Sequence, residues 1–315
     1  MNVAFFENKL SERGTTTSLF DYAYYNQKIL GNKSYVFYCK QHHVNNNDQV
    51  IEKFNKHFTV HGVVEFEEVD RYLTHYNINH IYIIKGGGID NQLSRVAKNC
   101  IHCVFNSKHP HGDVYSSIAP WVKGNNNKYP VVPHMINLPK HNLNMRQQLN
   151  IPKEAIVFGG YGGRDSFSIS FVHNVVYDIA KNNSNIYFLF ANFNKFCKSL
   201  PNIIHLPTII DLNEKVKFIN SCDANLWAQK HGEVMSLSMG EFSINNKPII
   251  CKNIGNPGHV HLLKDKAIWY KNKNDLKKIL LNFNPKIESQ KDWNAYKEYT
   301  PKKVMKIFND VYLNS

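Results

Sequence analysis

The chain has 315 residues, of which 43% are hydrophobic and 13% aromatic, so it can fill two compact cores and is not disordered as a whole. Its formal net charge of +13 favours anionic ligands, without choosing among nucleotides, acidic glycans, anionic lipids and nucleic acids. No apolar run approaches the roughly 20 residues of a membrane-spanning helix, no segment resembles a signal peptide, and six cysteines are too few for a disulfide framework. We therefore expect a reduced, cytoplasmic setting, in which the basic surface could contact an anionic membrane.

In the first half of the chain, short apolar runs alternate with polar segments of helical pattern. The expected strands cover residues 2–6, 34–39, 58–66, 80–86 and 100–106. The expected helices between them cover residues 15–30, 46–58 and 67–77. Such alternation predicts a parallel sheet covered on both faces, with ligands at the carboxyl ends of its strands.

Cys100 and Cys103 form a C-x-x-C pair within an expected strand. Residues three apart on a strand point to opposite faces, so the two sulfurs are badly placed to share a metal ion. We expect both cysteines to be buried structural residues and His102, between them, to belong to the core.

Residues 123–142 are rich in Asn, Pro and Lys and lack periodicity, as is typical of an interdomain connector. The alternation then restarts and continues almost to the end of the chain. The sequence thus predicts an α/β protein with two doubly wound, Rossmann-like domains, residues 1–135 and 136–292, facing each other across a cleft. A basic amphipathic helix at about 293–315 is expected to pack back on the first domain.

The segment HGEVMSLSMGEFSINNKP places Glu233 and Glu241 eight positions apart. A helix is expected to begin near Ser236, whose hydroxyl can cap first-turn amides, and such amides form a seat for a diphosphate. Carboxylates on either side could accept hydrogen bonds from vicinal sugar hydroxyls. A diphosphate with a sugar at each end is a nucleotide sugar.

This segment resembles the E-x7-E motif of the retaining family-4 glycosyltransferases, which have the GT-B fold. Glu233 and Glu241 match its two acids, and Lys247 with Pro248 follows at the family's distance. The resemblance, which spans about residues 100–260, implies that Glu233 contacts the donor sugar and Glu241 the ribose. It also implies that the amides around Met235, Ser236 and Leu237 bind the diphosphate.

The resemblance implies transfer from a UDP- or GDP-type sugar to a glycan, lipid-linked or protein acceptor, with retention of anomeric configuration. The acceptor would attack on the front side of an ion-pair transition state while helix amides and a basic side chain stabilise the leaving diphosphate. No metal or other cofactor is implied. Glu233 is the expected catalytic carboxylate, and His109, just past a strand end, is the expected histidine beside the donor sugar.

Other residues match the family more loosely. The phosphate clamp departs from the usual Gly-Arg and Lys, so Arg164 or Lys230 is expected to substitute for it, although Arg164 could equally be a solvated side chain after a glycine turn. A loop near Thr208 would face the nucleobase, and an ordinary capped helix explains the Gly14 segment nearly as well as a binding loop does. The remaining expected contacts are Gly162 and Gly163 on the donor side and Gly14, Thr15 and His111 on the acceptor side.

Two other classes stay open at this stage. A nucleotide-sugar epimerase of GT-B fold would need the donor alone and no acceptor. A nucleic-acid-binding protein would use the basic surface and bind with steep salt dependence, although the sequence has none of the usual recognition motifs.

Overall fold

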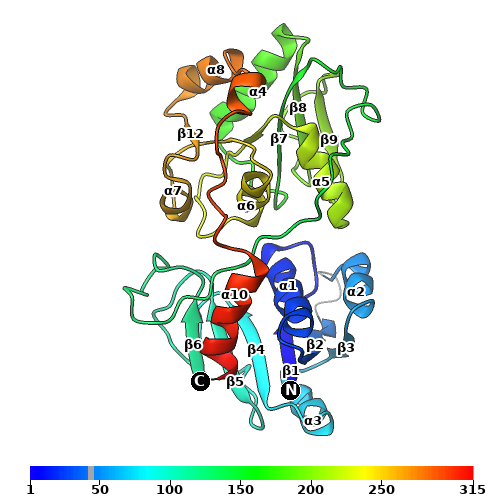
Figure 1. Cartoon of the computed structure of the whole chain (residues 1–315), viewed down its shortest axis with the longest axis vertical. Helices are drawn as coiled ribbons and strands as arrows, with labels where there is room; N and C mark the ends of the chain where they lie inside the picture. Colours follow the sequence, from blue (N-terminus) through cyan, green and yellow to red (C-terminus); the bar gives the residue numbers. More distant parts are fainter. Residues whose placement is uncertain (42–45, 315) are drawn as a thin grey trace. The chain divides into compact units, whose positions relative to one another are not determined.

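The computed structural model describes residues 1–41 and 46–314, which form two compact units. The first unit comprises Met1–Met135 with Glu298–Ser315, and the second comprises Ile136–Lys297. Each unit contains a parallel sheet of six strands with helices between them (Figure 1).

The first unit has the strand order β3-β2-β1-β4-β5-β6. Its strands are β1 (Asn2–Glu7), β2 (Lys33–Cys39), β3 (Thr59–Val63), β4 (His80–Lys85), β5 (Lys98–Cys103) and β6 (Val114–Ser117). Its α-helices are α1 (Gly14–Lys28), α2 (Asp48–Asn55), α3 (Val69–His75) and α10 (Pro301–Phe308), with a 3₁₀ turn at Phe66–Glu68 and a π-helical turn at Asn309–Leu313.

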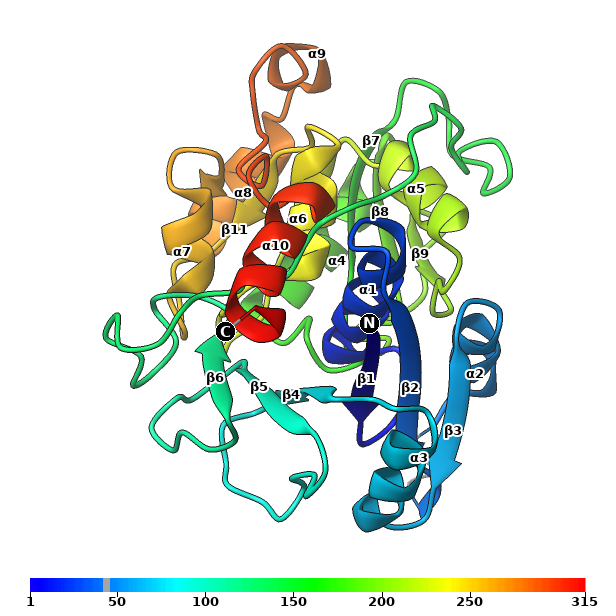
Figure 2. The same ribbon diagram turned by 60° about the horizontal axis from the view of Figure 1, so that its bottom comes forward.

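Alternation along β1 explains the two faces of this sheet. Phe6 packs edge-on against Phe66, on the side of α3, with ring centroids 4.8 Å apart. Phe5 points the other way and stacks on Phe308 of α10, which also stacks on Tyr22 of α1. Helices α1 and α10 therefore lie side by side on one face of the sheet (Figures 1 and 2).

The C-x-x-C pair is structural, as predicted. Cys100 and Cys103 are buried on β5, and all six cysteines of the chain are free. His102 is fully buried between them, and its Nδ1 lies 2.5 Å from the hydroxyl of Tyr82.

The helix predicted at 293–315 is shorter than expected. It begins only at Pro301, and residues 293–300 precede it in non-helical conformation. Proline favours the first position of a helix and restricts the residue before it to an extended conformation, which fixes this start. Thr300 is accordingly extended, with φ −74° and ψ 151°.

The second unit has the strand order β12-β11-β10-β7-β8-β9. Its strands are β7 (Ile156–Tyr161), β8 (Ile186–Ala191), β9 (Ile203–Leu206), β10 (Ala224–Leu226), β11 (Ile249–Cys251) and β12 (Ile268–Trp269). Its helices are α4 (Ser170–Asn182), α5 (Leu212–Ser221), α6 (Leu237–Ile244), α7 (Gly258–Leu263), α8 (Lys273–Leu281) and α9 (Pro285–Glu288).

The core of the second unit joins its sheet to α4 and α8. Phe158 on β7 and Phe188 on β8 pack with the apolar stripe of α4, which includes Val172 and Val176. Leu276 of α8 belongs to the same buried cluster. The four- and three-residue spacing of such apolar side chains is what makes these segments helical.

The prediction of strands alternating with helices in parallel sheets is correct, but some bounds and some short elements, such as β6 and α7, were missed. The strand expected at 58–66 ends at Val63, because the chain turns into the 3₁₀ turn at Phe66. The four-residue strand β6 was not predicted, because its sequence VYSS is too short to show a pattern.

Candidate functional site

The second sheet reverses its strand order between β7 and β10. From β7 the chain continues to β8 and β9 on one side, and then returns to β10, β11 and β12 on the other. In such sheets, ligands bind beyond the carboxyl ends of the strands at this reversal. The segments that leave this point are 162–169, after β7, and 227–236, after β10, and the second of them carries Glu233.

Helix α6 begins at Leu237, with Ser236 as its N-cap. The Ser236 hydroxyl accepts a hydrogen bond from the amide of Met239 at 3.4 Å. The amides of Leu237 and Ser238 bond to no described residue. Because first-turn amides carry the positive end of the helix dipole, this start can accept an anionic group.

Glu233 lies half-buried in the loop before α6, beside two side chains of the same loop. The indole Nε1 of Trp227 and the amide Nε2 of Gln229 each donate to Glu233 Oε1 at 3.4 Å. No described residue donates to Oε2. Burial raises the pKa of Glu233, and the two donors only partly offset this. The second oxygen is therefore available to a ligand hydroxyl.

Gly232 allows the Glu233 loop to pack closely against the segment that follows β11. Gly232 has φ +70°, and a Cβ there would lie 2.3 Å from the backbone nitrogen of Asn256. On the other side, the amide of His259 donates to the carbonyl of Glu233 at 3.1 Å. The buried His259 ring also lies against Trp227, with centroids 4.7 Å apart. This packing fixes the backbone and the indole that positions Glu233.

Glu241, the predicted ribose contact, already has partners within the second unit. It is buried in α6, where one oxygen accepts a hydrogen bond from the Tyr161 hydroxyl and the other from Lys215 Nζ at 3.0 Å. A buried carboxylate requires such partners. It could receive a ribose hydroxyl only through the remaining lone pairs of these oxygens. Burial, followed by the nearby charge of Glu241, raises the pKa of Tyr161 far above its usual range.

A chain of hydrogen bonds links the carboxyl ends of β7, β8 and β9. The carbonyl of Gly162 accepts from Asn192 Nδ2 at 2.7 Å, and Asn192 Oδ1 accepts from the Thr208 hydroxyl at 2.7 Å. Gly163 follows in the same loop and is exposed. The structure thus brings the predicted residues Gly162 and Thr208 to the same edge of the sheet.

The two candidate phosphate-binding cations lie in loops at this edge. Arg164 is exposed in the turn after β7, and Lys230 is exposed in the loop after β10. Neither side chain forms a hydrogen bond or ion pair with any residue of the described ranges. Both are free to move toward an anion.

The residues predicted for the acceptor side lie in the first unit. Gly14 and Thr15 open α1, whose N-cap Arg13 provides no side-chain cap. His109 and His111 are in the loop between β5 and β6, where His111 Nδ1 lies 2.8 Å from the carbonyl of His109. His109 is exposed and His111 half-buried, so neither is held in a fixed catalytic geometry by this unit.

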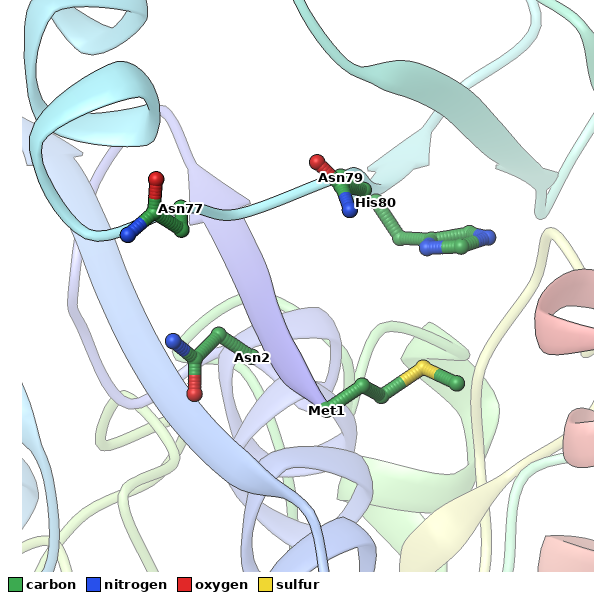
Figure 3. Close-up of a pocket in the computed structure, with 5 residues that line it drawn as sticks. All are labelled: Met1, Asn2, Asn77, Asn79 and His80. Carbon is green, nitrogen blue, oxygen red and sulfur yellow. The ribbon is translucent and has the colours of Figure 1, made fainter.

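A recess of about 290 Å³ is lined by Met1, Asn2, Asn77, Asn79 and His80 (Figure 3), but it lies at the amino ends of β1 and β4 and so away from the ligand edge. Among residues 1–41 and 46–314, no three His, Cys, Asp or Glu side chains are grouped so that they could hold a metal. Within the same ranges, no helix has the length and apolar character needed to cross a membrane.

Sequence reasoning missed four residues of this site, namely Tyr161, Lys215, Trp227 and His259. Tyr161 and Trp227 follow apolar runs and look like ordinary strand ends. Lys215 lies in a charged helix beside Lys217, and the sequence does not say which lysine turns inward. Their contacts depend on the order of the strands in the sheet, which local patterns do not encode.

No protein-family model and no curated protein matches this chain. Several solved structures, however, match the chain. A glycosyltransferase from Rickettsia africae ESF-5 aligns with a TM-score of 0.67 and 11% identity over 100% of this chain and 99% of that one. Anabaena Alr3699/HepE in complex with UDP and glucose aligns with a TM-score of 0.69 and 11% identity, over 98% of each chain.

A putative UDP-N-acetylglucosamine 2-epimerase from Listeria monocytogenes also aligns, with a TM-score of 0.61 and 12% identity over 98% of this chain and 95% of that one. Likeness at these identities establishes the fold. The predicted class, an α/β protein of GT-B type with two Rossmann-like domains, is confirmed.

Proposed function

We propose that this chain is a glycosyltransferase that takes its sugar from a nucleoside-diphosphate sugar. The observation that carries the proposal is the site around α6. A half-buried carboxylate, Glu233, has one oxygen without a partner among the described residues, next to a helix whose first amides are also unpartnered. Both stand where the sheet reverses its strand order.

The donor would bind with its diphosphate at the start of α6. The amides of Leu237 and Ser238 would meet the phosphate oxygens, and Arg164 and Lys230 would add positive charge from the two flanking loops. Thr208 would lie near the base and Glu241 near the ribose. Glu233 Oε2 would accept a hydrogen bond from a hydroxyl of the transferred sugar.

Transfer would break the bond between the anomeric carbon and the diphosphate oxygen while the acceptor oxygen bonds to that carbon. We propose that attack occurs on the face that the diphosphate leaves, so that configuration is retained. The acceptor's proton then passes to the departing phosphate oxygen, which the helix amides stabilise. In this scheme the protein mainly orients the donor and stabilises charge on the leaving group.

UDP is the nucleotide with the most support, because Anabaena Alr3699/HepE, which shares the fold, was solved with UDP-glucose and with UDP. A GDP-type donor is the alternative. The acceptor would be a glycan, a lipid-linked saccharide or a protein, and the net positive charge would favour one held at an anionic membrane.

The second candidate is a nucleotide-sugar epimerase, since a putative enzyme of that activity shares the fold. The two differ in what they need. An epimerase converts the nucleotide sugar alone, whereas a transferase releases nucleoside diphosphate and leaves the sugar on an acceptor. Product analysis of the nucleotide sugar without acceptor therefore separates them.

A thermal-shift screen tests the proposal. UDP, GDP, ADP and TDP, each with and without a hexose, are added to the full chain. One of them at about 100 times its Kd should stabilise the protein by about 2.7 kcal/mol, which is a shift of several degrees. If none of the nucleotides or nucleotide sugars shifts the melting temperature, the proposal is wrong.

A further inference from the structure

The first sheet also reverses its strand order, between β1 and β4. From β1 the chain continues to β2 and β3 on one side, and then to β4, β5 and β6 on the other. The last residues of these two strands are Glu7 and Lys85, and both are buried. Charged residues are rarely buried without a reason, and here two stand at the point of the sheet where ligands bind.

Glu7 has one oxygen engaged and one without a partner. Oε1 accepts a hydrogen bond from Arg13 Nη2 at 2.7 Å. Oε2 is buried and accepts no hydrogen bond of good geometry from any described residue, although the Thr15 hydroxyl is near enough to lower the pKa of the carboxyl. The side chain as a whole is only 6% exposed. Because Glu7 lies two positions after Phe5, it points to the face of the sheet that α1 covers.

The burial of Glu7 has an electrostatic consequence. It raises the pKa of this carboxyl to about 7, against the smaller lowering effects of Arg13, Thr15 and Lys9. Glu7 is therefore partly protonated near neutral pH and becomes an ionised acceptor of hydrogen bonds as the pH rises above 7. An unpaired buried acceptor of this kind is costly to the fold, which a ligand donor would relieve.

The neighbouring segments leave more polar atoms unpaired. Gln92 donates through Nε2 to Asn8, the residue after Glu7, at 2.7 Å, but its own Oε1 is buried without a described partner. The buried hydroxyl of Ser11, in the same loop as Asn8, is also unpartnered. The segments that meet at this point thus offer acceptors and a hydroxyl.

Two of the cations nearby, Lys85 and Arg13, are already paired. Lys85 Nζ donates to Asp90 and, at 3.1 Å, to the carbonyl of Gln92. Arg13 is held by Glu7. A site that presents a carboxylate and an amide oxygen, with Lys85 and Arg13 in use, fits a neutral donor of hydrogen bonds better than an anion. Sugar hydroxyls have this chemistry, because each can donate to a carboxylate and accept from a serine.

We propose that Glu7 holds the acceptor in the first unit, with Oε2 accepting a hydrogen bond from a hydroxyl of a neutral sugar residue. This inference rests on the proposed glycosyltransferase function and adds the residue that selects a carbohydrate as acceptor.

The test is a binding titration by saturation-transfer NMR at pH 8, where Glu7 is ionised. The probes are the methyl glycosides of glucose, galactose, mannose and N-acetylglucosamine. Four proteins are compared, namely wild type, Glu7→Gln, Glu7→Asp and the control Glu12→Gln. Glu12 lies in the same loop but is exposed, with its carboxylate bonded to Asn47. Glu7→Asp keeps the charge but withdraws the oxygens by one methylene. If the Gln variant does not fold, this variant still tests whether probe binding depends on the position of the carboxylate.

Wild type and Glu12→Gln are expected to bind at least one probe, with affinity lowered by about tenfold or more in both Glu7 variants, as for loss of a hydrogen bond to a charged group. The inference is overturned if no probe binds wild type, or if the Glu7 variant that folds binds as well as wild type does. The latter result would leave Glu7 a structural anchor for Arg13.

Nucleotide binding separates this failure from a failure of the proposed function. The donor site lies in the second unit, so Glu7→Gln should keep the thermal shift that nucleotide sugars give to wild type. Loss of sugar-probe binding in the variant with an intact nucleotide shift supports the acceptor role. Absence of any nucleotide shift in wild type contradicts the transferase, whereas unchanged probe binding contradicts only the role of Glu7.

Discussion

Lys215 on α5 and Glu241 on α6 form a buried ion pair, with Nζ 3.0 Å from Oε1 and side chains 12% and 7% exposed. The Tyr161 hydroxyl completes the arrangement from the end of β7. This contact ties together three elements that surround the reversal point of the second sheet. It also means that the second glutamate of the E-x7-E pair has a structural task as well as the proposed ribose contact.

Removing the lysine should therefore destabilise the chain. In Lys215→Met, Glu241 would stay buried without its cation, at a cost of about 3 kcal/mol. The matched control is Lys217→Met on the same helix, because its pair with Glu214 is partly exposed, with side chains 30% and 44% exposed, and should contribute less than about 1 kcal/mol. Denaturant unfolding of both variants measures the difference. Equal stability of the two would show that the pair does not support the fold.

Glu233 should matter for turnover and not for stability. In Glu233→Gln the side chain keeps its size, but the charge that would hold the sugar hydroxyl is lost. We expect kcat to fall about 10- to 100-fold, with a melting temperature within about 2 °C of wild type. Glu214→Gln, on the surface of α5, is the control and should retain full activity. A Glu233→Gln enzyme with wild-type kcat would remove this residue from the mechanism.

Gly232 should be needed for the geometry of the Glu233 loop. The methyl group of an alanine there would collide with the backbone of Asn256 at 2.3 Å. The alanine would also have to adopt φ +70°, which residues with a side chain rarely do. Gly31 has nearly the same φ but nothing within 4 Å of its Cβ, so Gly31→Ala measures the conformational cost alone, about 1 kcal/mol.

We expect Gly232→Ala to lose at least about 1 kcal/mol more than Gly31→Ala and to weaken nucleotide-sugar binding, as measured by denaturation and by titration. A Gly232→Ala protein as stable as Gly31→Ala would mean that the loop relaxes freely.

Acid should destabilise the first unit through His134. Burial lowers the pKa of His134 to about 3, whereas an unfolded histidine titrates near 6.5. The unfolded state therefore binds the proton first, and this contribution to stability is present above about pH 6.5 and lost as the pH falls toward 3. By pH 3 the loss amounts to about 4 kcal/mol. Burial also lowers the pKa of His102, which acts in the same direction.

The raised pKa of Glu7 acts in the opposite direction between about pH 4.5 and 7, since the folded state there binds the proton more tightly. The informative quantity is thus the difference between wild type and His134→Asn, measured as free energy of unfolding against pH. This difference should shrink as the pH falls below 6.5. Parallel curves for wild type and His134→Asn would refute the assignment.

The sequence was sufficient to predict the fold because the alternation of apolar strands and helical segments is repeated along the chain. Apolar runs such as residues 80–85 and 186–191 recur between helical segments, and each repeat supports the same parallel architecture. Pro301 shows the limit, because one residue set the start of the last helix eight positions later than the amphipathic pattern suggested. Local stereochemistry outweighed periodicity there.

The site was predictable where its residues are close in sequence. Glu233, Ser236 and Glu241 belong to one loop and helix, so their spacing alone placed an acid before the helix and another within it. Lys215 and Tyr161 reach Glu241 from other strands and helices, and only the strand order brings them there. Glu7 likewise reads as an ordinary polar residue after a strand, and its burial appears only in the folded unit.

The central claim is that the Glu233 loop and the start of α6 bind the diphosphate and sugar of a nucleotide sugar. Hydrogen–deuterium exchange of the full chain, with and without saturating UDP-glucose or GDP-mannose, tests it most directly. At least one of these ligands should slow exchange in peptides that cover residues 229–240, because the exposed amides at the helix start would become hydrogen-bonded. Unchanged exchange in these peptides, with protection elsewhere or nowhere, would contradict the account.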